Sequence, residues 1–165
     1  MRPVAYEPPA PFTALAPLIV EEALAQAVNG NPHGGGMLLV PLIEQSRFEC
    51  YALCVMLASA AAVGMKPHDG PGPIVLEVED TWTGRPASAA DLPQDMRFAA
   101  LFAAAVANDD RGQMKALFEA LACDAHTDAG MGRLVDGVLA LFLLAVGTTR
   151  ALIDHERANP NQEGN

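Results

Sequence analysis

The sequence predicts a mainly α-helical domain, an antiparallel bundle of about five helices with αα-hairpins and one or two short β-strands. Apolar residues recur every three or four positions in five segments, whereas only one segment alternates with a period of two. The last three helical segments are joined by connections of a few residues, which favours antiparallel hairpins. No sequence repeats at a fixed period, so a solenoid is not supported.

The N-terminal part divides into an extended arm and a first helix. Residues 1–16 are proline-rich and apolar, so we expect an arm rather than an independently folded segment. Pro17 suits the first turn of a helix, Val20, Leu24 and Val28 follow at steps of four, and Asn29-Gly30 ends it. We therefore assign one helical domain to residues 17–158, and a flexible tail to residues 159–165.

A second helix is predicted after a glycine-rich connection. Residues 31–36 contain three consecutive glycines and predict a flexible linker, after which Pro41 can open a helix that reaches Val63. Its first two turns form a polar end with Glu44, Gln45, Arg47 and Glu49, but every face is apolar from Cys50 onward, so its second half must be buried on all sides.

One segment has the pattern of a half-buried strand. It follows a loop predicted at residues 66–73, and Ile74, Leu76, Val78 and Trp82 alternate with more polar neighbours. A single strand needs a partner, which is either the segment 37–40 or the same strand of a second subunit. Leu76, Val78 and Trp82 are therefore the candidate interface residues.

The remaining three helices are marked by their caps and stripes. Asp91 and Pro93 predict a helix start, and Asp110 with Gln113 resembles a capping box at the start of the next helix. The apolar stripe of that helix is predicted at Met114, Leu117, Phe118 and Leu121, and its polar face at Arg111, Lys115 and Glu119. A last, central helix is predicted from about Gly132 to Arg157, after a turn at 124–132.

The composition indicates self-association and argues against nucleic-acid binding. The formal net charge is −10, which repels phosphate groups and anionic membranes. Only 18% of the residues are charged, against roughly 25% in ordinary soluble domains, so apolar patches are expected on the surface. We expect a homodimer, with a further protein partner as an option and the acidic segment 67–136 as its exposed face.

The cysteine usage and the apolar runs predict a cytoplasmic protein. Three cysteines do not suit a disulfide framework, and the proline-rich start does not match a secretory signal. The uncharged runs 50–65 and 137–149 are shorter than the roughly 20 residues of a membrane span. We expect both to be core helices, with no membrane association.

Familiar catalytic motifs are not matched. His33 and the glycines after it resemble an oxyanion-hole loop, but the required Gly-x-Ser-x-Gly elbow is missing from the sequence. Lys66 and Lys115 both follow methionine rather than the glycine of a Walker loop. Gly130-Met131-Gly132 lacks the third glycine of a dinucleotide-binding turn. The catalytic residues, if any, stay unknown, and no cofactor is expected.

Two residue sets have spacings that permit metal binding. Cys50 and Cys54 share a helix face, and with Cys123 and His126 they could supply four zinc ligands. The segment 124–128 offers Asp, His and Asp at steps of two, a set for a harder cation. The simpler interpretations are that the first two cysteines act as small apolar core residues and that Asp128 caps a helix. We therefore assign no metal.

Two classes of function follow. The first is a protein-interaction, scaffolding or regulatory module that acts as a homodimer, because its apolar helices exceed what a monomer can cover. The second is a small enzyme or ligand-binding protein with a pocket between helices, near the segments 34–36 and 66–73.

Overall fold

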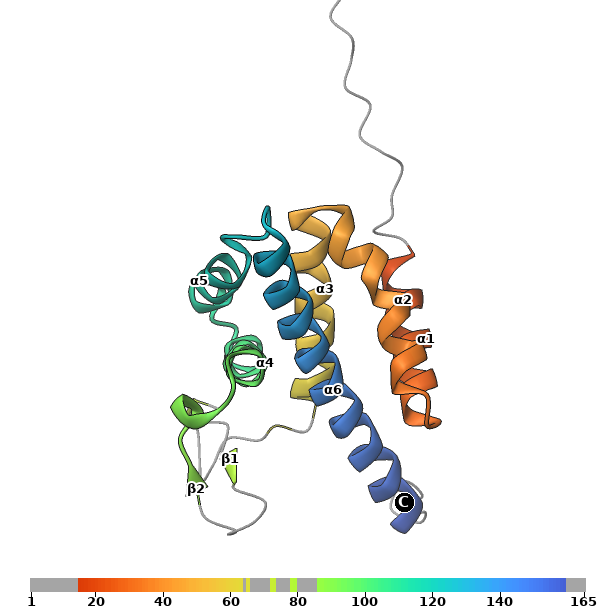
Figure 1. Ribbon diagram of the computed structural model, residues 1–165. Helices are drawn as coiled ribbons and strands as arrows, with labels where there is room; N and C mark the ends of the chain where they lie inside the picture. The colour runs from red at the N-terminus through yellow and green to blue at the C-terminus, as the bar shows by residue number, and fades with distance from the viewer. Residues whose placement is uncertain (1–14, 64, 66–71, 74–77, 80–85, 160–165) are drawn as a thin grey trace, which may run out of the picture.

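The computed structural model describes residues 15–63, 65, 72–73, 78–79 and 86–159 of the chain. The predicted mainly helical class is confirmed, and six α-helices lie in these ranges (Figure 1). They are, in chain order, α1 (Ala16–Val28), α2 (Pro32–Gln45), α3 (Arg47–Ala62), α4 (Gln94–Ala107), α5 (Arg111–Ala122) and α6 (Asp128–Ala158). A 3-10 turn, η2 (Ala89–Asp91), precedes α4.

Helix α6 is the centre of the bundle, as predicted, and packs against the five other helices. The hairpin of α1 and α2 lies on one side of it and α4 with α5 on the other, while α3 lies behind it in the view of Figure 1. Length and composition alone would allow α6 to cross a membrane; it is the one described helix of which this is true. In this fold its buried side chains, among them Val138, Leu141 and Phe142, form the middle of the apolar core.

Helix α1 ends and α2 begins in a three-residue turn. Gly30 has a φ of 98°, a left-handed conformation that favours glycine. The side chain of Asn31 then accepts a hydrogen bond from the Gly34 N–H at 3.0 Å and caps α2, whose first residue is Pro32. The predicted end of the first helix at Asn29-Gly30 is therefore confirmed.

The flexible linker predicted for residues 31–36 is wrong, because these residues begin α2. Gly35 explains why glycine is present there. A Cβ atom on Gly35 would lie 2.3 Å from the carbonyl oxygen of Ala23, which is closer than any real contact. The glycine thus lets the backbones of α1 and α2 approach directly, and the packing of α2 against α1 and α6 outweighs the poor helix propensity of glycine.

The single helix predicted from Pro41 to Val63 is divided in two at Ser46. This residue has extended backbone angles (φ −163°, ψ 158°), and its side chain accepts a hydrogen bond from the Glu49 N–H at 3.1 Å. Ser46 therefore caps α3, while Pro41 lies inside α2. Beyond Cys50 the predicted burial on all sides is only partly seen: one face of α3 is buried, through Leu53, Cys54, Leu57, Ala58 and Ala61, whereas the other residues are half-buried and Ser59 is exposed.

Two strands of two residues each are present, β1 (Val78–Glu79) and β2 (Pro86–Ala87), and they pair antiparallel. Most of the strand predicted at 74–82, including Leu76 and Trp82, lies outside the described residues, as does the side chain of Val78. The alternative partner at 37–40 is wrong, because those residues belong to α2.

Helices α4 and α5 form as predicted. Asp110 accepts a hydrogen bond from the Gln113 N–H at 2.9 Å, and the predicted stripe on α5 is covered, with Met114, Phe118 and Leu121 buried. Helix α6 begins earlier than predicted, because Thr127 rather than Asp128 caps it by accepting a hydrogen bond from the Gly130 N–H. The arm before residue 15 and the tail after residue 159 lie outside the described residues.

Candidate functional site

The four candidate zinc ligands do not converge. Cys50 and Cys54 are both buried in α3, whereas Cys123 and His126 are exposed near the end of α5. No three His, Cys, Asp or Glu side chains in the described ranges are grouped to hold a metal. A hydrogen bond with the Cys50 thiol, together with burial, raises the pKa of Cys54 well above its ordinary value. The geometry thus fits the interpretation of the pair as core residues.

The segment 124–128 is a turn in which Asp124 and Thr127 have structural partners. The Asp124 carboxylate pairs with Arg133 at 3.2 Å, and the Asp124 carbonyl oxygen accepts the Thr127 hydroxyl at 2.9 Å. A Cβ on Gly130 would lie 1.8 Å from that same carbonyl oxygen, so the turn is held against the first turn of α6. Asp124 thus holds the turn in place through both its side chain and its carbonyl oxygen.

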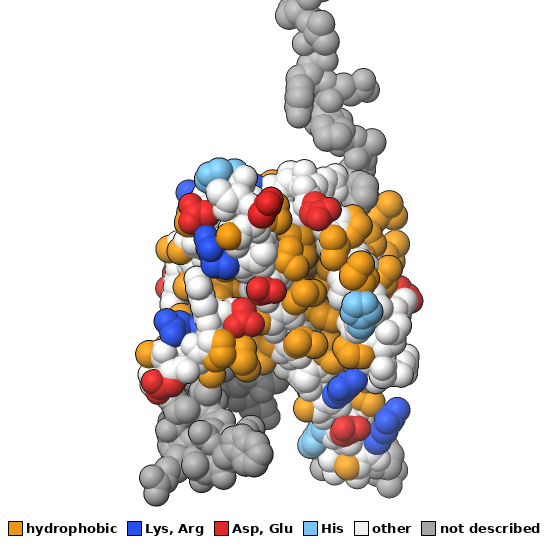
Figure 2. All heavy atoms as spheres, viewed as in Figure 1, with side chains coloured by type: hydrophobic (Ala, Val, Ile, Leu, Met, Phe, Trp, Pro, Cys, Tyr) orange, Lys and Arg blue, Asp and Glu red, His pale blue; other side chains and the backbone are white. Residues whose placement is uncertain are grey.

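An apolar hollow of about 300 Å³ lies between α2 and α6. We call it the α2–α6 groove; its lining residues are Pro32, His33, Gly36, Met37, Val40, Leu139, Phe142 and Leu143. Met37 and Leu143 are each 56% exposed on its rim. Gly36 leaves the floor open, because a Cβ there would lie 3.3 Å from Leu139. Figure 2 shows the groove as part of an apolar band between the two helices.

The two ends of the groove carry opposite charges. Helices α2 and α6 are antiparallel (Figure 1), and Gly35 and Gly36 of α2 face Phe142 and Leu139 of α6. On α6, Asp136 lies seven positions before Leu143, and on α2, Glu44 lies seven positions after Met37. Seven positions are about two helical turns, so each carboxylate lies on the same helix face as its rim residue. Because the helices are antiparallel, both carboxylates lie toward the same end of the groove. Arg150 donates a hydrogen bond to the Ala27 carbonyl, next to the start of α2, and so lies beyond the other end.

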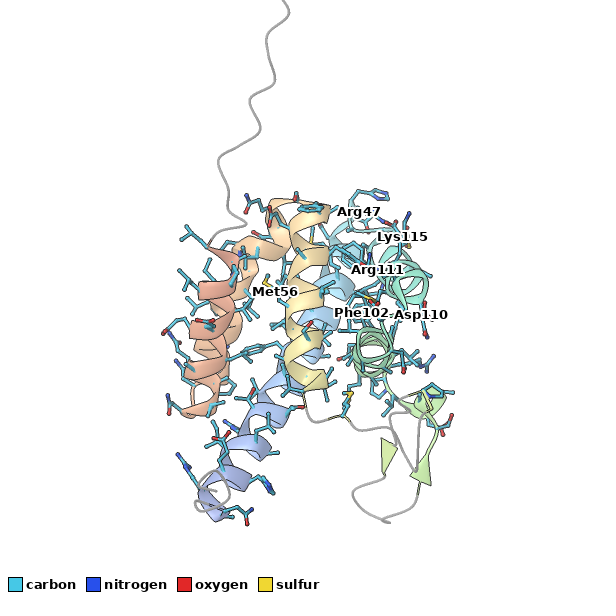
Figure 3. The ribbon with its side chains drawn as sticks, turned by 180° about the vertical axis from the view of Figure 1, so that it is seen from behind. Arg47, Met56, Phe102, Asp110, Arg111 and Lys115 are labelled. Carbon is cyan, nitrogen blue, oxygen red and sulfur yellow. The ribbon has the colours of Figure 1, made fainter. Side chains whose placement is uncertain are left out.

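A second hollow, of about 460 Å³, lies between α3 and α5. We call it the cationic pocket; its lining residues are Arg47, Phe48, Tyr51, Arg111, Lys115, Phe118 and Glu119. Seen from behind in Figure 3, Arg47 lies at the start of α3, and Arg111 and Lys115 come from α5. Three cations and one carboxylate thus line a single pocket in a chain whose formal net charge is −10.

Aromatic rings hold the two walls of the cationic pocket. The Tyr51 ring on α3 meets the Phe118 ring on α5 edge to face, with centroids 5.2 Å apart, and also contacts Phe102 at 6.2 Å. Such pairs are favourable beyond the apolar area that they bury. Phe118 and Phe102 are buried, so the rings form a fixed floor, while Phe48 on the rim is 69% exposed.

Arg47 ties α3 to α5 at this pocket. Its guanidinium forms an ion pair with Glu119 and donates a hydrogen bond to the Ala122 carbonyl at 3.2 Å, near the end of α5. Both side chains of the ion pair are about half exposed, so solvent screens the attraction. The main effect of these contacts is to fix where the Arg47 charge lies.

The sequence did not identify the cationic pocket. Arg111, Lys115 and Glu119 were recognised only as the polar face of a helix, and Arg47 only as part of the polar end of another. The available signal was local, namely an arginine as the first residue of a predicted helix, at Arg111. Their gathering around one hollow depends on the packing of α3 and α5 against α4 and α6.

Comparison with known proteins gave no match to a family model, to a curated protein or to a solved structure.

Proposed function

We propose that this protein is a protein-interaction module that acts as a homodimer, and that the α2–α6 groove is its interface. The observation that carries this proposal is an uncharged hollow with half-exposed apolar side chains on its rim. Exposed apolar patches of this kind typically mark interaction surfaces. A second candidate function, the binding of a small ligand, is favoured by the cationic pocket and is taken up in the next subsection.

The shape of the groove supports a second copy of the chain as its occupant. A two-fold symmetric interface must be complementary to itself. This face carries both the projecting side chains, Met37 and Leu143, and the hollow above Gly36 that can receive such side chains. Two copies related by a two-fold axis can therefore insert the rim of one into the groove of the other.

The charge pattern supports the same occupant. Two chains of net charge −10 repel each other, so their contact is most favourable at a face without acidic residues in its centre. An antiparallel arrangement places Glu44 and Asp136 of one copy toward Arg150 of the other. Opposite charges then meet at both ends of the interface.

Sedimentation velocity of the full chain tests the proposal. We expect a species of about 35 kDa, twice the 17.3 kDa mass of the chain, at micromolar concentration. Leu143→Glu and Met37→Glu should each give a folded monomer, because a buried carboxylate without a partner opposes association. Far-UV circular dichroism verifies that the variants are folded.

Leu18→Glu is the matched control, because Leu18 lies on α1 away from the groove and is 59% exposed, close to the 56% of Leu143. This variant should remain dimeric. A parent chain that stays monomeric at 100 µM, or a dimer that survives Leu143→Glu, would contradict the proposal. If the chain is monomeric, the remaining candidate occupant of the groove is a different protein.

A further inference from the structure

We propose that the cationic pocket binds a small organic anion in which an aromatic or other apolar body carries a carboxylate or phosphate group. The pocket offers both halves of this chemistry, because cations from α3 and α5 surround a floor of aromatic rings. Its volume of about 460 Å³ lies in the range of pockets that hold small ligands.

Helix stability does not explain the positions of the two arginines. Arg47 is the first residue of α3 and Arg111 is the first residue of α5. The N-terminus of a helix has a partial positive charge, so a cation there is unfavourable. The first turn of α5 contains no acidic residue, and the carboxylates beside it are those of Asp110, which caps the helix, and Asp109, which forms only an exposed ion pair with Arg111. A bound anion gives the exposed charge of Arg111 a further favourable partner.

Two of the three cations are available to a ligand. Arg47 is engaged by Glu119, whereas Lys115 has no hydrogen bond or ion pair with the described part of the chain. Arg111 reaches only Asp109, at 3.6 Å, in an ion pair whose side chains are 87% and 85% exposed and which is therefore weak. Guanidinium groups pair with carboxylate or phosphate through parallel hydrogen bonds, and an ammonium group binds either as a point charge.

The apolar part of the ligand has a defined place. Phe48 is the most exposed large apolar side chain in the described ranges, at 69%, and it stands at the rim of the pocket. A ligand ring between Phe48 and the edge of Tyr51 covers apolar surface that water otherwise contacts. A purely charged ligand leaves that surface exposed, so we expect binding to require both halves of the molecule.

An NMR titration of ¹⁵N-labelled full-length protein tests the assignment with four probes. 2-Naphthoate and 2-naphthyl phosphate carry both halves of the ligand, 2-naphthalenemethanol lacks the charge, and inorganic phosphate lacks the ring. We expect at least one of the first two to shift amide signals at the starts of α3 and α5. Which one binds more tightly separates a carboxylate ligand from a phosphate ligand. The other two probes should bind at least about tenfold more weakly.

The double variant Arg111→Gln, Lys115→Gln should weaken binding of the better probe by at least about tenfold. Arg133→Gln, Arg157→Gln is the matched control, because it removes the same charge from exposed side chains outside the pocket and should leave the affinity within about twofold. Absence of binding by both naphthyl anions at 5 mM would overturn the assignment. So would equal affinity for the alcohol or for inorganic phosphate, or equal weakening by the control.

This inference is independent of the proposed dimer, because none of the lining residues of the pocket lines the groove. A Leu143→Glu monomer should bind the naphthyl probe as the parent does. A failure of one proposal is therefore distinguishable from a failure of the other.

Discussion

The two sides of α2 differ in how completely they are covered. On one side Gly35 lies directly against the backbone of α1, and Leu39 is fully buried. On the other side Met37 is half exposed above the hollow at Gly36. Helix α2 thus has a buried side that stabilises the monomer and an open side that the monomer leaves exposed. Apolar character alone therefore does not indicate which residues are core and which are interface.

The largest expected difference between the two sides is in side-chain truncation. Leu39→Ala removes a fully buried side chain and should lower the free energy of unfolding by about 3 kcal/mol. Met37→Ala should change it by less than about 0.5 kcal/mol, because the side chain is half exposed. Urea denaturation in the Leu143→Glu background measures both without a contribution from self-association. Equal losses would show that the open side is also part of the core.

Adjacent glycines give a second, smaller contrast. Gly35→Ala should lower the free energy of unfolding by about 2 kcal/mol, because its Cβ meets the Ala23 carbonyl and the helices must separate. In Gly36→Ala the new Cβ meets the end of the Leu139 side chain at 3.3 Å and the Phe142 ring at an ordinary 4.0 Å, so the gain in helix propensity should leave stability nearly unchanged. Chemical denaturation compares the two variants. A harmless Gly35→Ala would contradict the close α1–α2 contact.

The smallest expected effect concerns the charged ends of the open side. Asp136→Lys should weaken the dimer about threefold to tenfold, because it places like charges opposite each other in the antiparallel arrangement. Adding Arg150→Asp in the same chain should recover part of the affinity. Asp91→Lys in η2 is the control with the same charge change and should have little effect. Sedimentation equilibrium at low salt measures the dissociation constants, and an absence of recovery would contradict the arrangement.

The sequence predicted those helices whose signals are local. The cap from Asp110 to Gln113 and the stripe through Met114, Phe118 and Leu121 both depend on residues within one helix, and both were confirmed. The division at Ser46 also had a local signal that was missed. Serine followed three positions later by Glu49 is the pattern of a capping box, and the apolar run after it obscured the break.

The glycines at 34–36 show what local patterns cannot predict. Alone they favour a flexible linker, but Gly35 is helical because another helix lies against it, which is a property of the tertiary contact. The cationic pocket is missed for the same reason. Arg47 and Arg111 are 64 positions apart, and only the packing of their helices brings them together. The oligomeric state and the ligand depend on such nonlocal surfaces and stay predictions.

The extended backbone at Ser46 connects the two proposed sites directly. It is the one residue between α2, which carries half of the groove, and α3, whose first two residues line the pocket. Ser46 thus joins the two helices at an angle. A change in the backbone angles of Ser46 must move Arg47 and Phe48 relative to Met37 and Val40. The relative positions of the two surfaces therefore depend on the backbone angles of a single residue.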